Sequence, residues 1–268
     1  MDIVAFAVGL GALVGFVLAF TGAGGGIFAI PLLVFGLHLP VQQAAPAGLL
    51  AVGLAAAAGA YLGLREGMVR YRAAALIGGV GMITAPLGVF AVQYLPNRPL
   101  LAGFALVLVY TAWRFLRPAS LKVSAPVEVP CLMDKVALRL IWTQACARAL
   151  AGTGLISGVL SGLLGVGGGF VIVPALTRYT DLDVRSIQLT SLAVIALVSL
   201  SGVSAAAWHG TVPWRLALPF AFGAISALLS GRLVANKIQP ACLQKAFAWV
   251  SLLVAALMLA RAFGWHVR

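Results

Sequence analysis

Two glycine-rich segments are the part of this chain best suited to binding chemistry. They consist of Thr21, Gly22, Ala23, Gly24, Gly25 and Gly26, and of Gly165, Val166, Gly167, Gly168 and Gly169. Each segment separates an apolar stretch of helix length from a shorter apolar stretch. A helix that restarts after such a break carries free N–H groups and the positive end of its dipole, and both attract anions. The two segments therefore predict a backbone site for a small anion. Tight helix packing is the alternative reading of these glycines.

Hydroxyl groups that could complete an anion site follow the second segment. Thr190 and Ser191 belong to the stretch Gln188-Leu-Thr-Ser, and both can donate hydrogen bonds to a bound anion. Back-bonding to their own helix is an equally open interpretation. The aligned stretch of the first half, Ala45-Pro-Ala-Gly48, has no hydroxyl group. We therefore expect the site to be chemically asymmetric.

The sequence has no suitably placed residues for acid–base catalysis or metal binding inside the apolar segments. The six carboxylates and three histidines all lie in termini, loops, the linker or at segment ends: Asp2, Glu66, Glu128, Asp134, Asp181, Asp183, His38, His209 and His266. Proton pumps and cation transporters usually place such groups inside the membrane. Ser161 could act as a nucleophile only with a buried histidine partner, which the sequence does not offer. We expect no catalytic residues, no metal site, no cofactor and no enzymatic activity.

The three cysteines, Cys131, Cys146 and Cys242, have neither metal-ligand nor redox-motif spacing. We therefore expect reduced thiols, with no disulfide and no zinc site.

The elements that position the glycine segments are membrane-spanning helices. Hydrophobic residues make up 62% of the 268 residues and charged residues only 9%, which is far below the usual content of a soluble domain. Runs without any charge cover 3–64, 73–97, 99–113, 149–177, 186–214, 216–231 and 246–260. A crossing needs about 20 apolar residues. The composition predicts an all-α polytopic membrane protein, and it excludes nucleic-acid binding despite a net charge of +12.

The chain repeats itself at an offset of 143 residues. Without gaps, Gly11, Gly15, Gly22 and Pro31 align with Gly154, Gly158, Gly165 and Pro174, and Gly67, Arg72 and Gly88 align with Gly210, Arg215 and Gly231. We expect a first membrane repeat over residues 1–117, a linker over 118–148 and a second repeat over 149–268. In each repeat a glycine-broken hairpin precedes three transmembrane helices. The end of the linker, Met133–Leu150, could form an amphipathic surface helix, and an unstructured loop is the alternative.

Charge distribution indicates how the two repeats are inserted. If each broken segment turns back as a hairpin, each half crosses the membrane an odd number of times and the halves are inverted repeats. That arrangement places 14 of the 18 basic residues on the face of the linker, whereas a through-crossing arrangement splits them 12 to 6. The positive-inside rule then predicts a cytoplasmic linker and external termini.

Several of these motifs resemble the TauE/SafE sulfite-exporter family. The resemblance rests on the glycine segments followed by Pro31 and Pro174, on Gln188–Leu192, and on the paired loops Arg65–Arg70 and Trp208–Pro213. It implies a multi-pass permease of the bacterial inner membrane, built from two inverted repeats, that exports sulfite or a small organosulfonate. By the same resemblance the glycine segments, Thr190 and Ser191 form the sulfonate site.

The resulting hypothesis is a permease for a small sulfur oxyanion, bound between the two glycine breaks near the membrane centre. The alternatives are a non-transporting membrane scaffold or complex subunit whose glycines only pack helices, and an intramembrane enzyme. The expected partners are a small anionic substrate and the lipid bilayer, with no nucleic acid, and a homodimer is one option for the oligomeric state.

Overall fold

The long uncharged runs of the sequence form the helices of a bundle. The computed structural model describes residues 3–22, 25–116, 131, 133–134, 139–140, 143–235 and 240–262. Six described helices are long and apolar enough to cross a membrane: α1 (Ile3–Thr21), α3 (Val41–Arg65), α4 (Tyr71–Tyr94), α6 (Gln144–Leu164), α8 (Val184–Trp208) and α9 (Trp214–Ala235). Helices α5 (Asn97–Leu116) and α10 (Pro240–Ala262) pack against each other. The prediction of an all-α polytopic membrane protein is confirmed.

Each glycine break is followed by a short helical segment that turns back. After the first break, η1 (Gly25–Phe28), α2 (Ala29–Pro31) and η2 (Leu32–Gly36) follow one another, and after the second break comes α7 (Gly169–Tyr179). A Cβ atom on Gly36 would lie 2.7 Å from Leu10 Cδ1, in the first half of α1. The end of η2 therefore lies beside the beginning of α1.

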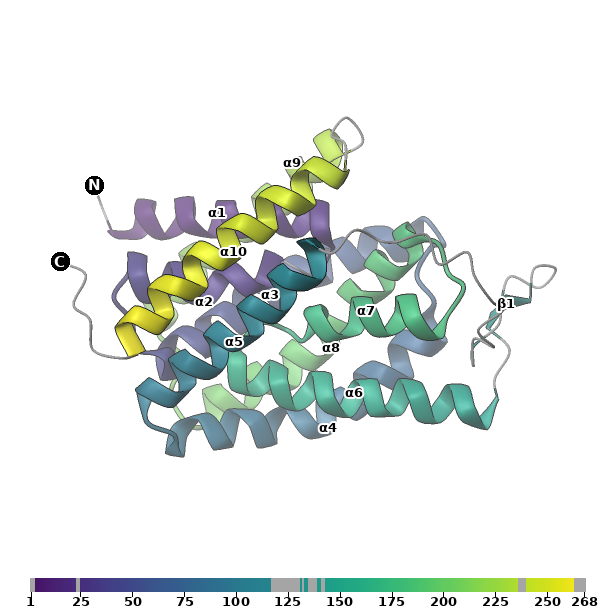
Figure 1. The fold of residues 1–268 in the computed structure, drawn as a ribbon, viewed down its shortest axis with the longest axis horizontal. Helices are drawn as coiled ribbons and strands as arrows, with labels where there is room; N and C mark the ends of the chain where they lie inside the picture. Colours follow the sequence, from purple (N-terminus) through teal and green to yellow (C-terminus); the bar gives the residue numbers. More distant parts are fainter. Residues whose placement is uncertain are drawn as a thin grey trace.

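The second hairpin returns in the same way. The N–H of Cys131 donates a hydrogen bond of 3.1 Å to the carbonyl of Tyr179, the last residue of α7, and Cys131 is disulfide-bonded to Cys146 in the first turn of α6. The beginning of α6 and the end of α7 thus share one end of the bundle. Figure 1 places this end, with β1, opposite the end at which α1 begins and α10 finishes.

The hairpin helices pack against helices from the other half of the chain. Helix α1 lies against α9, and α6 lies against α4. A Cβ atom on Gly11 would overlap the backbone of Phe220, and one on Gly154 would overlap the carbonyl oxygen of Ile77. Because each approach is backbone to backbone, both positions require glycine. The two contacts join equivalent positions of the repeat, since Gly11 aligns with Gly154 and Ile77 with Phe220.

Helices α3 and α8 form the centre of the bundle and are the most buried of the long apolar helices. Gly53 packs on Ser199 and Gly59 on Leu192, so the residue numbers fall along α8 as they rise along α3. The two helices are therefore antiparallel. They are also equivalent in the repeat, since Val41 aligns with Val184 and Arg65 with Trp208.

The linker differs from the sequence-based expectation in two respects. The expected surface helix over Met133–Leu150 is wrong, because β1 (Met133–Asp134) pairs antiparallel with β2 (Arg139–Leu140) and α6 begins at Gln144. Thr143 sets this beginning, since its side chain accepts a hydrogen bond of 3.1 Å from the N–H of Cys146 and caps the helix.

The expectation of reduced thiols is also wrong for two of the three cysteines, because Cys131 and Cys146 form a disulfide with their Cα atoms 5.0 Å apart. Their separation of 15 residues carries no motif. The proximity arises from the anchoring of Cys131 on the end of α7, a contact that spacing along the chain does not reveal. Cys242 lies in α10.

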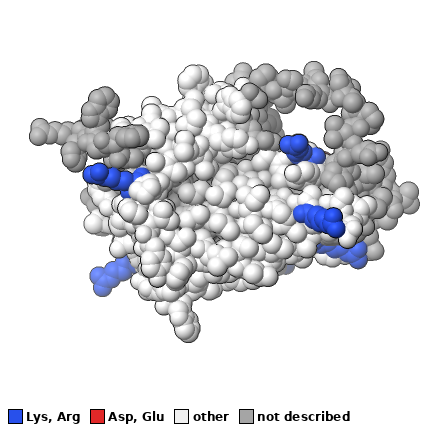
Figure 2. All heavy atoms as spheres, turned by 60° about the horizontal axis from the view of Figure 1, so that its bottom comes forward, with Lys and Arg blue, Asp and Glu red and all other residues white. Residues whose placement is uncertain are grey.

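Charged side chains lie towards the ends of the bundle. Figure 2 shows described Arg side chains near the two ends of one face, with a broad band of uncharged atoms between them. A band of this kind matches the hydrocarbon region of a bilayer, where charged side chains are costly.

Candidate functional site

The two glycine breaks adopt backbone conformations that favour glycine. Gly22 has φ 70°, and Gly165, Gly167 and Gly168 have φ 60°, 78° and 71°. Residues with a Cβ atom rarely occupy this left-handed region. All four glycines are buried, as are Gly25, Gly26 and Gly169, whereas Gly24 lies outside the described residues. Irregular backbone at this depth is tolerated in membrane proteins where protein surrounds it or where it lines a cavity.

The structure brings the two breaks into contact. A Cβ atom on Gly26 would lie 2.6 Å from the carbonyl oxygen of Val166. The same atom would lie 3.1 Å from Cγ1 of Val52, and a Cβ atom on Gly167 would lie 3.4 Å from that methyl group. Val52 of α3 therefore touches both breaks. Segments 140 residues apart in the sequence meet at one point inside the bundle.

Each break also packs against the central helix of the other half. A Cβ atom on Gly22 would lie 2.6 Å from Cβ of Gln188 in α8, and one on Gly165 would overlap the backbone of Ala45 in α3. The positions are equivalent in the repeat, because Gly22 aligns with Gly165 and Ala45 with Gln188. A movement of α3 or α8 must therefore displace the breaks.

Helix α7 begins at the second break without a side-chain cap. Its N-cap residue, Gly168, has no side chain to offer, and the Gly168 carbonyl accepts hydrogen bonds from the N–H groups of Val171 and Ile172. The positive end of the α7 dipole thus points into the buried contact between the breaks.

Two buried hydroxyl groups lie on α6 and α8, the helices whose Ser157 and Ile195 contact the second break. Ser161 is fully buried, and its Oγ has no hydrogen-bond partner among the described residues. A Cβ atom on Gly168 would lie 3.0 Å from Cβ of Ser157, and Ser161 follows Ser157 by one turn on the same face of α6. The Oγ of Ser199 is likewise buried without a partner, and it packs on Gly53, the neighbour of Val52. Unpaired buried hydroxyls are rare because they cost free energy.

The hydroxyl group of Thr21 closes the first break. It donates a hydrogen bond of 2.9 Å to the carbonyl of Val17 and accepts one of 3.0 Å from the N–H of Gly25. The second break has Leu164 at the equivalent position. Thr21 therefore stabilises the break in this conformation.

Thr190 and Ser191 are both fully buried and hydrogen-bonded within the protein. The Thr190 hydroxyl accepts a hydrogen bond of 3.1 Å from the N–H of Arg70, at the beginning of α4. The Ser191 hydroxyl donates one of 2.7 Å to the carbonyl of Gln188 in its own helix. Sequence reasoning singled out these two residues and gave Ser161 and Ser199 no binding role. Serines are common in apolar helices, so only their missing partners distinguish Ser161 and Ser199.

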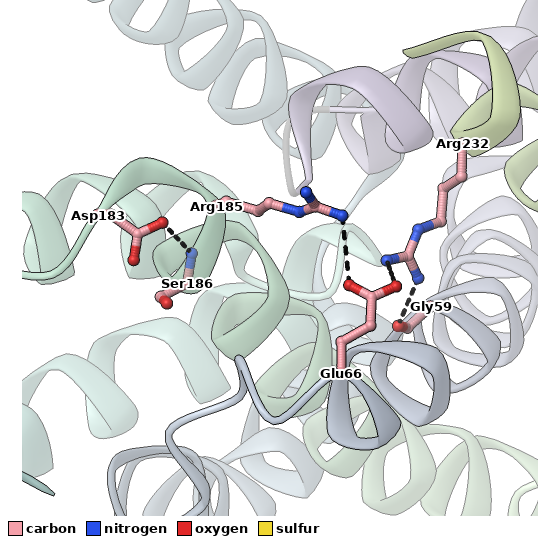
Figure 3. A network of polar contacts seen from close by, with 6 residues as sticks. All are labelled: Gly59, Glu66, Asp183, Arg185, Ser186 and Arg232. Atoms are coloured by element: carbon pink, nitrogen blue, oxygen red, sulfur yellow. Dashed lines mark hydrogen bonds and ion pairs between the residues drawn. The ribbon is translucent and has the colours of Figure 1, made fainter. Parts of the chain in front are cut away.

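A cluster of charged side chains joins the two halves at the linker end of the bundle. The Glu66 carboxylate lies 3.3 Å from Nη2 of Arg185 and 3.2 Å from Nη2 of Arg232, and Arg232 also donates a hydrogen bond of 3.1 Å to the carbonyl of Gly59 (Figure 3). The cluster connects the end of α3 with α8 and α9. It carries one negative and two positive charges and therefore has a net positive charge.

Asp183 caps the start of α8 beside this cluster. Its carboxylate accepts a hydrogen bond of 3.2 Å from the N–H of Ser186 (Figure 3). Hydrogen bonding by the Ser186 side chain, with further bonds from backbone N–H groups, lowers the pKa of Asp183 against the opposing effect of partial burial. Within the described part of the chain, no group of three or more His, Cys, Asp or Glu side chains could hold a metal ion.

An apolar bundle of crossing helices around buried helix breaks is the architecture of a multi-pass membrane protein. Residues 7–258 match the model of the sulfite exporter TauE/SafE family, and the chain belongs to this family. A probable membrane transporter protein of Xylella fastidiosa (strain 9a5c) is 29% identical, over 96% of this chain and 95% of the relative. The probable membrane transporter protein YdhB of Bacillus subtilis (strain 168) is 25% identical, over 92% and 96%. No solved structure matches. Proteins of this family reside in the bacterial inner membrane.

Proposed function

We propose that this transporter exports a small sulfur oxyanion, sulfite or an organosulfonate, and binds it between the two glycine breaks. The observation that carries the proposal is the contact of both breaks with Val52 inside the bundle. The uncapped start of α7 supplies N–H groups and a positive dipole end at this point. The Ser161 hydroxyl, which has no described partner, is a donor for an anion at the same place.

We also infer that residues 1–117 and 149–268 are inverted repeats joined by the linker 118–148. The support comes from contacts that recur at equivalent positions of the two repeats. Gly11 packs on Phe220, and its equivalent Gly154 packs on Ile77, the equivalent of Phe220. The antiparallel course of α3 and α8 adds to this support. Inverted repeats that pack around a central site can rock between two arrangements, each open to one side of the membrane.

The conformation is closed around the proposed site, because the described glycines of both breaks are buried. The Glu66 cluster holds α3, α8 and α9 together at the linker end. We infer that an anion reaches the breaks from that side when these helices separate. Arg185 and Arg232 would then be freed from Glu66, and their positive charges would attract the approaching oxyanion.

Transport by purified protein tests the proposal. Proteoliposomes are loaded with radiolabelled sulfite, taurine, sulfate or chloride, and efflux is compared with that of protein-free liposomes. We expect saturable efflux of sulfite or taurine and much slower efflux of chloride. Equal leakage of all four solutes with and without protein would favour the alternative of a non-transporting scaffold.

A further inference from the structure

A groove with a volume of about 590 Å³ runs along the outside of the second hairpin, between α5, α6 and α7. Its walls are mostly apolar and include Val107, Tyr110, Ile156, Leu160, Phe170 and Pro174. Several of these side chains lie in segments that the uncharged runs of the sequence assign to the membrane. The groove therefore opens to the hydrocarbon region of the bilayer rather than to water.

Positive charge lines only one end of this groove. Arg148 is the fifth residue of α6 and Arg178 is the last but one of α7, so both lie at the linker end of the bundle. Both are exposed, and neither forms an ion pair or hydrogen bond with a described residue. From Arg148 the groove follows α6 to Leu160, about 18 Å at the helical rise of about 1.5 Å per residue.

This distribution matches one leaflet of a bilayer, whose hydrocarbon half is about 15 Å thick. The cations lie where a lipid headgroup would be, and the apolar walls extend from there towards the midplane. Basic pockets between transmembrane helices bind anionic headgroups. We propose that the groove is a binding site for an anionic phospholipid, with its phosphate between Arg148 and Arg178 and an acyl chain along Ile156 and Leu160.

The occupant is a lipid and not the transported oxyanion, because the side chains that line the deep end of the groove are apolar. That end is formed by Leu160 and Phe170, and a small hydrated anion would lose its water there without compensation. Phe170 directly follows Gly169, so a lipid chain at this point contacts the first turn of α7. The proposed lipid site therefore supports the hairpin from outside and does not depend on the identity of the substrate.

The site belongs to the second half alone. In the repeat, Arg148 aligns with Ala5 and Arg178 with Phe35, so the first hairpin has an apolar pair where the second has two arginines. Gly152 lines the groove, and a Cβ atom there would meet no atom within 4 Å. Its equivalent, Gly9, has the same open surroundings. This equivalence supplies a matched control inside the same chain.

The test uses the full-length protein in nanodiscs of equal parts phosphatidylglycerol and phosphatidylcholine, with retained lipid measured by native mass spectrometry. The Arg148→Gln/Arg178→Gln variant should lower the ratio of retained phosphatidylglycerol to phosphatidylcholine about 30-fold, from the typical contribution of two basic side chains near an anionic surface. The control is Arg98→Gln/Arg215→Gln, which removes two exposed arginines at the other end of the bundle and should leave the ratio unchanged.

A second pair of variants probes the acyl-chain part of the groove. Gly152→Leu should reduce retention of phosphatidylglycerol although both arginines remain, and Gly9→Leu should not. Melting temperatures measured on the same samples identify any variant that has lost its fold. Equal retention in the parent and in both test variants would overturn the proposal, as would an equal loss in the two arginine pairs.

Discussion

Replacing Ser161 by alanine tests whether its hydroxyl group lowers the stability of the protein while it contributes to binding of the oxyanion. In the closed conformation the Ser161 Oγ is buried without a described partner. An unsatisfied buried hydroxyl costs about 1–3 kcal/mol, so its removal should leave the free energy of unfolding unchanged or raise it by about 1 kcal/mol. A serine whose hydroxyl group lowers the stability of the folded protein is expected in a binding site, where the same hydroxyl group contacts a ligand.

The effect of Ser161→Ala on the ligand should be opposite. A hydrogen bond to a charged group is worth about 1.5–3 kcal/mol, which corresponds to roughly a 10- to 100-fold loss of affinity for the oxyanion. The assay combines thermal unfolding with sulfite efflux from proteoliposomes on the same preparation. Ser157→Ala is the matched control, because the Ser157 hydroxyl already donates to the carbonyl of Gly154 at 3.1 Å. It should transport as the parent does.

Two results would refute this reasoning. If Ser161→Ala transports sulfite as fast as the parent at concentrations below saturation, the hydroxyl does not bind the ligand. If Ser161→Ala unfolds more easily than Ser157→Ala, its hydroxyl has a structural partner, and the missing partner is no sign of function.

Three further predictions concern the linker end. Asp183→Ala should lower the free energy of unfolding by about 1 kcal/mol, because the variant loses a helix cap. The folded-state pKa of Asp183 is lowered, so the stabilisation by its carboxylate exists at neutral pH and disappears as the pH falls through that pKa. The melting temperatures of parent and variant should therefore converge in acid. Glu66→Gln should lower the free energy of unfolding by less than about 1 kcal/mol, since the ion pairs of Glu66 are partly exposed. The same change should speed opening of the linker side, measured as faster chemical labelling of a cysteine introduced near the breaks. A reporter fused after Ala125 should be cytoplasmic according to the charge distribution; an external signal would instead agree with the Cys131–Cys146 disulfide, which is typical of oxidising compartments.

The sequence predicted several of the long helices because charged residues lie near their ends. The uncharged run 186–214 covers most of α8 (Val184–Trp208), and the uncharged run 73–97 covers most of α4 (Tyr71–Tyr94). Uncharged runs end where side chains leave the hydrocarbon region, so composition alone locates them within a few residues. The linker was not predictable in this way, because its strands and disulfide depend on contacts with the end of α7.

The candidate site was predictable only in outline. The repeat and the glycines indicated two equivalent breaks, and their contact through Val52 is consistent with that expectation. Which hydroxyl groups remain without partners depends on neighbours that are distant in the sequence. Thr190 illustrates this, since its partner is the N–H of Arg70, 120 residues away. No spacing rule indicates such a pair, and none distinguishes Ser161 from Ser157.

Equilibrium binding of radiolabelled sulfite to Gly26→Ala tests the central claim most directly. The new Cβ atom would lie 2.6 Å from the carbonyl oxygen of Val166, so it must push the two breaks apart. The control is Gly103→Ala, where a Cβ atom meets nothing within 4 Å. We predict saturable binding to the parent and to Gly103→Ala, and at least about fivefold weaker binding to a folded Gly26→Ala protein, since overpacking of this kind typically costs about 1–3 kcal/mol. Binding of equal strength in all three proteins would contradict a site between the breaks.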